Sequence, residues 1–195
     1  MRKPQVLLII PCLNEQESIQ PLLNEIDSLY ANYSTLVIDD GSSDQTYSRA
    51  VVLSPTVKLL KNLGIGGAVQ TGIKYAKNHG FDFCIQIDGD GQHPPTEVAK
   101  LLKAYEEKPA SLLIGSRYLH NEGFRSTFAR RFGGKAIAFL LNILFSGCKI
   151  TDPTSGMRLM DRKAIEFFSD IYPYDFPEPI SLAWAIRGGL TVREC

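Results

Sequence analysis

The chain contains 195 residues, and its 21 Lys and Arg residues balance 21 Asp and Glu residues. This length fits one domain with a substantial core. The zero formal net charge argues against a nucleic-acid partner, because the sequence supplies no global basic field to attract one.

The apolar segments indicate a protein that does not cross a membrane, and the cysteines favour a reducing compartment. Residues 1–4 lead directly into a short apolar run, whereas a signal peptide has a longer hydrophobic segment and a cleavage site. The longest apolar stretch, 136–145, is shorter than the roughly 20 residues that a bilayer requires. The four cysteines lack metal-ligand spacing, and Cys12 and Cys84 fall in strand-like runs where a free thiol is a small core residue. We expect a cytoplasmic protein, with peripheral membrane contact left open.

Short apolar runs alternate with helix-like segments up to residue 115. The runs that predict strands are 6–10, 36–38, 57–60, 83–87 and 112–115. Helices are expected after each of the first four runs, and they include 97–107; Asn14 is a candidate cap for the first helix, and Ser43 or Asp44 for the second. This alternation predicts an α/β domain with a mostly parallel sheet and right-handed crossovers.

The pattern changes after residue 117. Residues 118–131 are polar and have no clear period. An apolar helix is expected at 132–145, a loop-rich stretch at 150–160, a helix at 161–168 and a Pro-rich turn at 172–178. A helix at 180–186 and a short strand at 190–192 complete the chain.

Asp88, Gly89 and Asp90 follow the run at 83–87. In α/β proteins, ligands collect beyond the carboxyl ends of the strands. Two carboxylates at such an end, with a glycine that permits close approach, suit a hard divalent cation and the phosphates it carries. A strand end closed by an Asx-type turn is the alternative, and it requires no ligand.

Carboxylates follow other strands as well. The five that we expect to converge at one edge of the sheet are Glu15, Asp39, Asp40, Asp88 and Asp90. Crowded carboxylates repel one another, and a divalent metal, sugar hydroxyls or the N–H groups of a base would each relieve that repulsion. Asp39 or Asp40 could accept from ribose hydroxyls.

The glycine-rich segment 61–68 matches neither a P-loop nor a dinucleotide-binding fingerprint. Its N–H groups, at the start of a helix, could still meet a diphosphate. Close packing of the helix on the sheet explains Gly66 and Gly67 equally well.

Six motifs occur in a fixed order along nearly the whole chain: PCLNE at 11–15, IDDGSSDQT at 38–46, NLGIGGAVQTG at 62–72, IDGDGQHPP at 87–95, GSR at 115–117 and DPTSGMR at 152–158. Together they resemble the family-2 glycosyltransferases of GT-A fold. Within that family, they are most similar to the branch of the dolichyl-phosphate mannose synthases and the bacterial polyprenyl-phosphate glycosyltransferases.

The resemblance implies a metal-dependent, inverting transfer of a hexose from a GDP- or UDP-sugar to a polyprenyl phosphate. Residues 1–117 would form the nucleotide-sugar half of one domain, and 118–195 the acceptor half. By similarity, Mg²⁺ or Mn²⁺ would be held by Asp88, Asp90 and Gln92. The residues that would line the nucleotide pocket are Pro11, Asn14, Glu15, Asp39, Asp40, Gly64 and Asp88.

An attacking phosphate is already anionic, so such an enzyme needs cations that seat one anion beside another rather than a general base. Arg117 and Arg131, together with Asp90, are the residues that we expect to be catalytic. For Arg130 and Arg158, phosphate binding and a solvated surface position stay open. The apolar helix expected at 132–145 adjoins basic residues, which favours a membrane interface over a buried core or dimer helix.

Two other functions fit the same motifs. Transfer to a sugar hydroxyl would require a carboxylate base, for which Asp152 is the obvious candidate. Relatives in this family continue beyond the point where residue 195 falls, so the acceptor side is expected to be truncated, and a non-catalytic nucleotide-sugar binding module is the third hypothesis. The oligomeric state is left open.

Overall fold

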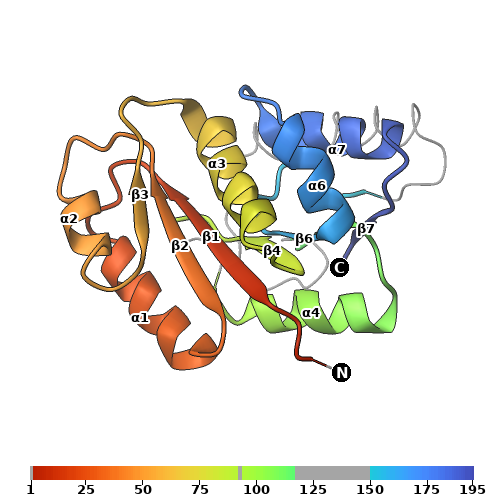
Figure 1. The fold of residues 1–195 in the computed structure, drawn as a ribbon, viewed down its shortest axis with the longest axis horizontal. Coiled ribbons are helices and arrows are strands. Elements are labelled where there is room, and N and C mark those ends of the chain that lie inside the picture. Colours follow the sequence, from red (N-terminus) through yellow and green to blue (C-terminus); the bar gives the residue numbers. More distant parts are fainter. Residues whose placement is uncertain (1, 92–93, 117–149) are drawn as a thin grey trace.

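The computed structural model describes residues 2–91, 94–116 and 150–195. These residues form a seven-stranded sheet in the order β3-β2-β1-β4-β6-β5-β7 (Figure 1). The strands are β1 Val6–Cys12, β2 Ser34–Asp39, β3 Thr56–Lys58, β4 Phe83–Gln86, β5 Leu112–Ile114, β6 Arg158–Asp161 and β7 Val192–Glu194. The helices are α1 Ile19–Tyr30, α2 Thr46–Ala50, α3 Gly64–Asn78, α4 Glu97–Glu107, α6 Arg162–Asp170 and α7 Pro177–Arg187.

The sheet is mostly parallel, as the alternation predicted. β1 pairs in parallel with β2 and β4, β2 with β3, and β5 with β7, whereas β6 is antiparallel to both of its neighbours. The prediction of a loop at 150–160 was therefore wrong for residues 158–160. Charged residues stand at both ends of β6, Arg158 and Asp161, so the strand has too few consecutive apolar residues to be recognised from pattern.

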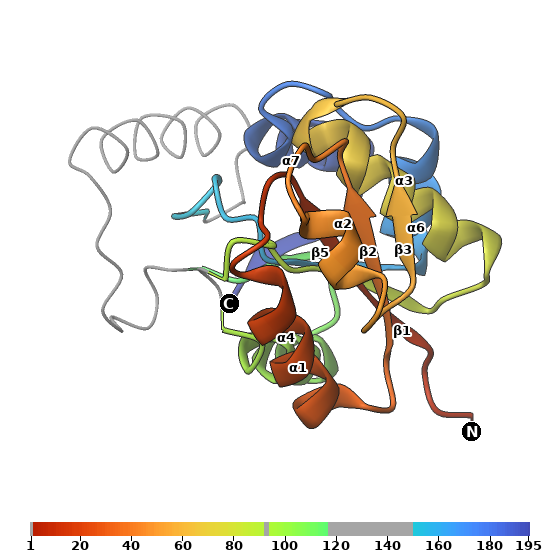
Figure 2. The same cartoon turned by 90° about the vertical axis from the view of Figure 1, so that its left-hand side faces the viewer.

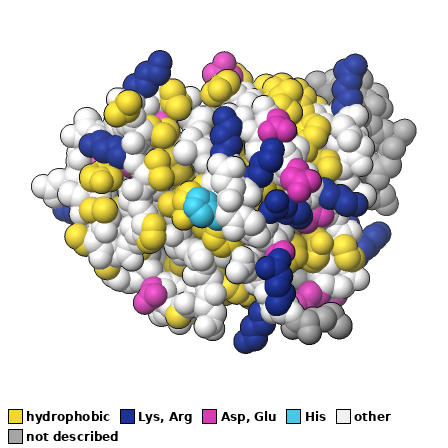
Figure 3. Space-filling model, viewed as in Figure 1, with side chains coloured by type: hydrophobic (Ala, Val, Ile, Leu, Met, Phe, Trp, Pro, Cys, Tyr) yellow, Lys and Arg dark blue, Asp and Glu magenta, His cyan; other side chains and the backbone are white. Residues whose placement is uncertain are grey.

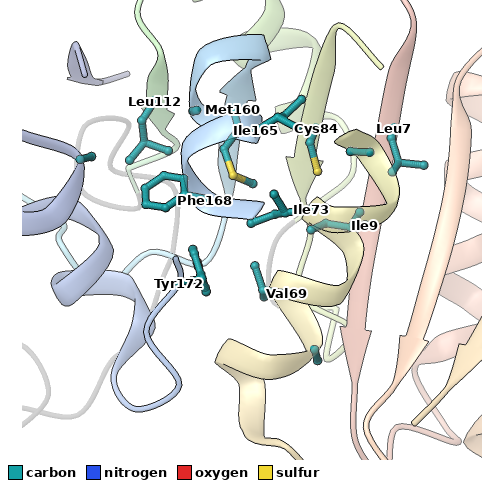
Figure 4. Close-up of a cluster of buried hydrophobic side chains, with 14 of the residues drawn as sticks. Leu7, Ile9, Val69, Ile73, Cys84, Leu112, Met160, Ile165, Phe168 and Tyr172 are labelled. Atoms are coloured by element: carbon teal, nitrogen blue, oxygen red, sulfur yellow. The ribbon is translucent and has the colours of Figure 1, made fainter. Parts of the chain in front are cut away.

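Helices cover both faces of the sheet. α3, α6 and α7 pack on one face, and α1, α2 and α4 on the other (Figures 1 and 2). Every residue of β1 is buried, and its side chains alternate: Leu7 and Ile9 join the first core cluster, while Leu8 and Ile10 join the second. This two-sided burial is why β1 is a continuous apolar run. Figure 4 shows the first cluster, where Ile73 of α3 lies beside Ile9 of β1, and Phe168 of α6 lies between Leu112 of β5 and Tyr172.

Two helix starts differ from the sequence prediction. α1 begins at Ile19, and Asn14 does not cap it; Asn14 lies in a turn before the helix with a positive φ of 57°. α7 begins at Pro177, inside the expected Pro-rich turn, because proline is well suited to a first helical position where its missing N–H costs nothing. The cap expected at Ser43 or Asp44 is also wrong: Gln45 occupies the N-cap position of α2 without a side-chain cap, although the Asp44 side chain, one residue earlier, accepts from the Thr46 N–H.

The surface is mixed in charge, in keeping with the balanced composition. On the face formed by α3 and α6, Lys, Arg, Asp and Glu side chains are interspersed (Figure 3). Lys77 pairs with Asp170 across the two helices, and Arg162 pairs with Glu166 along α6. Within the described ranges, no helix combines the length and the apolar character that a membrane crossing requires.

Candidate active site

A cleft of about 440 Å³ opens beyond the carboxyl ends of β1, β2 and β4. This is the place where a parallel α/β sheet collects its ligands. Six of the residues predicted for the nucleotide or metal site line the cleft: Pro11, Glu15, Asp40, Gly64, Asp88 and Asp90. Asn14 and Asp39 do not line it, although both lie within one residue of a lining position.

The loop after β1 is tied to the loop after β2, and this explains Asn14. The Asn14 N–H donates to Ser42 Oγ at 2.9 Å, and Asn14 Oδ1 accepts from the Ser43 N–H at 2.9 Å. The positive φ of Asn14 brings these groups together, and asparagine tolerates that conformation better than most residues. Asn14 therefore holds one wall of the cleft in place from outside.

A second set of hydrogen bonds fixes the same two loops one step further along. The Glu15 N–H donates to Thr46 Oγ1 at 2.7 Å, and the Gln16 N–H donates to Asp44 Oδ2 at 3.2 Å. Burial raises the pKa of Asp44, but hydrogen bonds from Thr46 and Gln16 outweigh it and hold that pKa below its ordinary value. The ionised Asp44 thus orders the chain around Glu15, which faces the cleft.

Asp39 and Asp40 have different surroundings although they are adjacent. Asp39 is fully buried; its Oδ1 accepts from the Ser42 N–H at 3.1 Å, whereas its Oδ2 is a buried oxygen without a partner among the described residues. Asp40 accepts from the Leu63 N–H at 2.7 Å and so ties β2 to the segment before α3. Burial raises the pKa of Asp40 against the hydrogen bonds from Leu63 and Gly64, and the neighbouring Asp39 charge adds to the increase.

The glycines of α3 serve packing, but not in the way that the sequence suggested. A Cβ at Gly66 would lie 2.6 Å from the Tyr174 carbonyl oxygen, so Gly66 admits the backbone of the loop before α7. Gly67 would contact Leu63 of its own turn, and helix-on-sheet packing falls instead to Gly72, which faces Ile9. Gly66 therefore brings α7 to the cleft.

Asp88 is held between a side-chain donor and a glycine. Gln86 Nε2 donates to Asp88 Oδ1 at 3.2 Å. On the other side, a Cβ at Gly156 would lie 2.6 Å from Asp88 Cγ, so the carboxylate rests against the backbone there. Gly89 is equally confined, since its Cβ would lie 2.9 Å from Cys12 Cβ.

A family model described as glycosyl transferase family 2 matches residues 7–168. The chain belongs to glycosyltransferase family 2. The UDP-N-acetylglucosamine–dolichyl-phosphate N-acetylglucosaminyltransferase of Methanococcus voltae is 29% identical over 185 residues, which cover 85% of this chain and 72% of that protein. The polyprenol monophosphomannose synthase of Mycolicibacterium smegmatis is 30% identical over 202 residues, covering 97% and 75%.

Solved structures show the same fold. The glucosyl-3-phosphoglycerate synthase of Mycobacterium tuberculosis, crystallised with Mn²⁺, UDP and phosphoglyceric acid, superposes with a TM-score of 0.72 at 19% identity. The match covers 98% of this chain and 68% of that one. The sequence predictions of a family-2 glycosyltransferase and of a single GT-A domain with a mostly parallel sheet are confirmed.

The glycosyltransferase presents a carboxylate pair rather than a complete metal cage. Among the described residues, no three His, Cys, Asp or Glu side chains gather around one point that could hold an ion. Asp88 and Asp90 nevertheless line the same cleft, and Mg²⁺ is commonly bound by one or two carboxylates that leave its other positions to phosphates and water. The donor set therefore fits a cation that arrives with a diphosphate.

Arg158 is neither a phosphate ligand nor a surface residue. Its side chain is buried, with 1% of the residue exposed. The guanidinium donates to the carbonyl oxygens of Pro153, Ser155 and Glu178 and to Ser181 Oγ. Both open interpretations of Arg158 are therefore wrong, because its N–H groups are directed to the protein itself.

Glu178 is a cleft residue that the sequence did not single out. It stands in the first turn of α7 and lines the cleft together with Asp88 and Asp90. Asp152, the base expected for a hydroxyl acceptor, is fully buried instead, and its Oδ1 accepts from Thr154 Oγ1 at 3.2 Å. Glu178 could have been suspected only from its position between two prolines at a helix start.

Several predicted features lie outside the described residues. They are Gln92 of the metal set, the arginines Arg117, Arg130 and Arg131, and the apolar helix expected at 132–145. Their roles stay predictions from the sequence.

Proposed function

We propose that this glycosyltransferase moves a hexose from a GDP- or UDP-sugar to the phosphate of a polyprenyl lipid, with Mg²⁺ or Mn²⁺ as cofactor. The observation that carries the proposal is the convergence of Glu15, Asp40, Asp88, Asp90 and Glu178 on one cleft at the carboxyl ends of the strands. Several carboxylates lining one cleft favour the binding of a divalent cation together with a diphosphate. The Mn²⁺ and UDP in the solved neighbour and the lipid phosphates in the names of the relatives agree with it.

The nucleotide is assigned to the side of the cleft formed by β1, β2 and the start of α3. Asp40 lines this side of the cleft, so its carboxylate is assigned as the acceptor for an N–H or O–H of the nucleoside. The adjacent Asp39 is fully buried and does not line the cleft, and its role in nucleoside binding stays a prediction from the sequence. Asp88 and Asp90, with Gln92, would hold the metal, which neutralises charge on the departing diphosphate.

The acceptor phosphate attacks the anomeric carbon from the face opposite the diphosphate. The bond from this carbon to the diphosphate oxygen breaks while a new bond forms to the acceptor oxygen, giving a lipid-linked sugar phosphate and a free nucleoside diphosphate. The acceptor is already ionised, so no proton must be removed. Arg117 and Arg131 are proposed to seat the acceptor phosphate, because guanidinium binds phosphate through two hydrogen bonds.

Exposed apolar side chains lie in the chain segments that supply residues to the cleft, and they support a lipid acceptor. The loops before α3 and α7 emerge at the same edge of the molecule (Figures 1 and 2). The apolar rim consists of Leu13, Leu60, Leu63, Ile65, Tyr174 and Phe176, all of them exposed. Leu13 and Ile65 line the cleft itself, so an acceptor that lies in a membrane would approach across this rim.

A donor screen tests the first half of the proposal. Thermal shift and calorimetry with UDP- and GDP-sugars, with and without Mn²⁺, should give one nucleotide that stabilises the protein only when metal is present. Asp90→Ala should abolish this metal-dependent stabilisation by the nucleotide, whereas Asp27→Ala, at an exposed position of α1, should leave it unchanged. Metal-independent binding in the wild type would refute the metal assignment.

Transfer of a radiolabelled hexose to polyprenyl phosphate tests the second half. Arg131→Ala should lower the affinity for the lipid phosphate far more than the affinity for the donor. An equal loss in both affinities would refute the acceptor role of Arg131. Donor binding without transfer to any acceptor would favour the non-catalytic binding module.

The rim is tested with vesicles. Leu60→Ser combined with Phe176→Ser should reduce binding to phospholipid vesicles that contain polyprenyl phosphate. Val52→Ser is the matched control, because Val52 is 71% exposed but lies in the loop after α2. Equal losses in both proteins would show that the rim has no special role.

Glu178 favours a second candidate function, transfer to a sugar hydroxyl. A hydroxyl nucleophile must lose its proton, and a carboxylate in the cleft could accept it. General-base catalysis contributes about 10²–10⁴-fold, so Glu178→Gln should reduce hydroxyl transfer by that factor and leave transfer to a phosphate nearly unchanged. The Glu178→Gln protein thus separates the two reactions.

A further inference from the structure

Gln86 is a polar side chain in an apolar position. It is the last residue of β4, a central strand between β1 and β6, and only 1% of it is exposed. Along β4 the side chains alternate, with Ile85 and Ile87 in one core cluster and Cys84 in the other. Gln86 therefore shares the face of Cys84, directly beneath the segment that carries Asp88.

The amide of Gln86 is only half satisfied. Its Nε2 donates to Asp88 Oδ1 at 3.2 Å, whereas its Oε1 is buried and has no partner among the described residues. The reverse orientation would set the amide oxygen against an ionised carboxylate. A buried amide with one end unpaired is less stable than an apolar side chain of the same shape, so core stability does not account for a glutamine here.

The groups around Gln86 converge on the same carboxylate. In the antiparallel register Gln86 stands opposite Arg158, and Arg158 holds the 153–155 loop through two carbonyl oxygens. That loop leads to Gly156, whose backbone forms the wall against Asp88. Asp88 is thus confined by a donor from β4 and by a wall that is anchored from β6.

We propose that Gln86 is a positioning residue that holds the Asp88 carboxylate in the orientation required by the divalent metal and its diphosphate. The inference rests on the part of the proposed function that concerns binding of the nucleotide sugar and its metal. Groups that orient a metal ligand in this way contribute about 10–100-fold to metal affinity. Gln86 itself touches neither metal nor substrate.

The test uses Gln86→Met, which keeps the length and volume of the side chain and removes the donor. The control is Gln70→Met on α3, because Gln70 is also a buried amide of this face but donates to the Ser169 carbonyl oxygen. Mn²⁺ binding is measured by electron paramagnetic resonance and calorimetry in the presence of UDP or GDP, whichever the wild type binds. Urea unfolding is measured in parallel.

Gln86→Met should remain as stable as the wild type or become more stable, while its Mn²⁺ affinity falls about 10–100-fold. Its transfer rate should recover as Mn²⁺ is raised, so that the KM for metal changes more than kcat. Gln70→Met should keep the wild-type Mn²⁺ affinity. If Gln86→Met unfolds, Gln86→Leu provides the same comparison.

Two outcomes would overturn the inference, and they are distinguishable. Normal Mn²⁺ affinity in a folded Gln86→Met protein refutes the positioning role and leaves the proposed function intact. Failure of the wild type to bind Mn²⁺ with either nucleotide refutes both.

Discussion

Replacing Gly156 by alanine would place a Cβ within the space of the Asp88 carboxylate. The added atom would lie 2.6 Å from Asp88 Cγ and closer still to both oxygens. Because carbon atoms pack at about 3.5–4.0 Å, the carboxylate must move by about 1 Å. A displacement of this size in a reacting group can cost about 10²-fold in rate, so we expect a loss of that order in metal-dependent donor binding and transfer.

The free energy of unfolding of the Gly156→Ala protein should fall by less than the about 1–3 kcal/mol that overpacking usually costs. The reason is that the end of an aspartate side chain can rotate away from the added atom. Gly72→Ala is the matched control, since its Cβ would lie 2.9 Å from Ile9 Cγ2 in the core, away from the cleft. Calorimetry with Mn²⁺ and nucleotide, together with urea unfolding, compares the two. Wild-type affinity in a folded Gly156→Ala protein would refute the view that the position of Asp88 matters for donor binding.

Three further predictions concern the frame of the cleft. Arg158→Met should lower the free energy of unfolding by about 3–5 kcal/mol, and a loss below 1 kcal/mol in urea unfolding would contradict its anchoring role. The lowered pKa of Asp44 stabilises the fold above pH 3.8, its ordinary value, and this contribution is lost as the pH falls through the folded pKa. The difference in urea stability between the wild type and Asp44→Asn should therefore be largest near neutral pH and shrink in acid. A difference independent of pH would be evidence against stabilisation by the ionised Asp44. Burial, with the charge of Asp39 next, raises the pKa of Cys12 to about 12, and burial raises that of Cys84. Neither thiol should be alkylated in the native protein at neutral pH, as mapped by mass spectrometry, and rapid labelling of Cys12 would show that β1 opens.

The parts of the fold predicted from sequence are those in which local pattern and burial agree. α4 was predicted with its observed ends, Glu97 and Glu107, because its apolar positions recur at helical spacing between polar ones. β1 and β4 were predicted to within two residues, since strands buried on both faces are continuous apolar runs. Their ends locate the carboxylates of the cleft directly.

The contacts between loops could not be predicted from the sequence pattern, because they join residues that are distant in the chain. Asn14 resembles a helix cap in the sequence, yet its partner is Ser43, 29 residues away. Gly66 resembles a residue of helix–sheet packing, yet it admits the backbone of Tyr174. That second contact carries Glu178 to the cleft, so a residue whose only local signal is its two flanking prolines becomes part of the site.

β6, the one antiparallel strand of the sheet that the described residues form, explains the errors near residues 150–160. In a parallel strand, the residues that follow it lie at the ligand edge, and Asp40 and Asp88 could be located by that rule. β6 runs in the opposite direction, so the residues that precede it, among them Gly156, lie at that edge instead. Arg158, at the start of β6, is therefore directed into the layer beneath the cleft, where it anchors both the loop before β6 and the Glu178 end of α7. The sheet thus positions Asp40 and Asp88 of the cleft from its parallel strands, and it fixes the surrounding backbone from its antiparallel one.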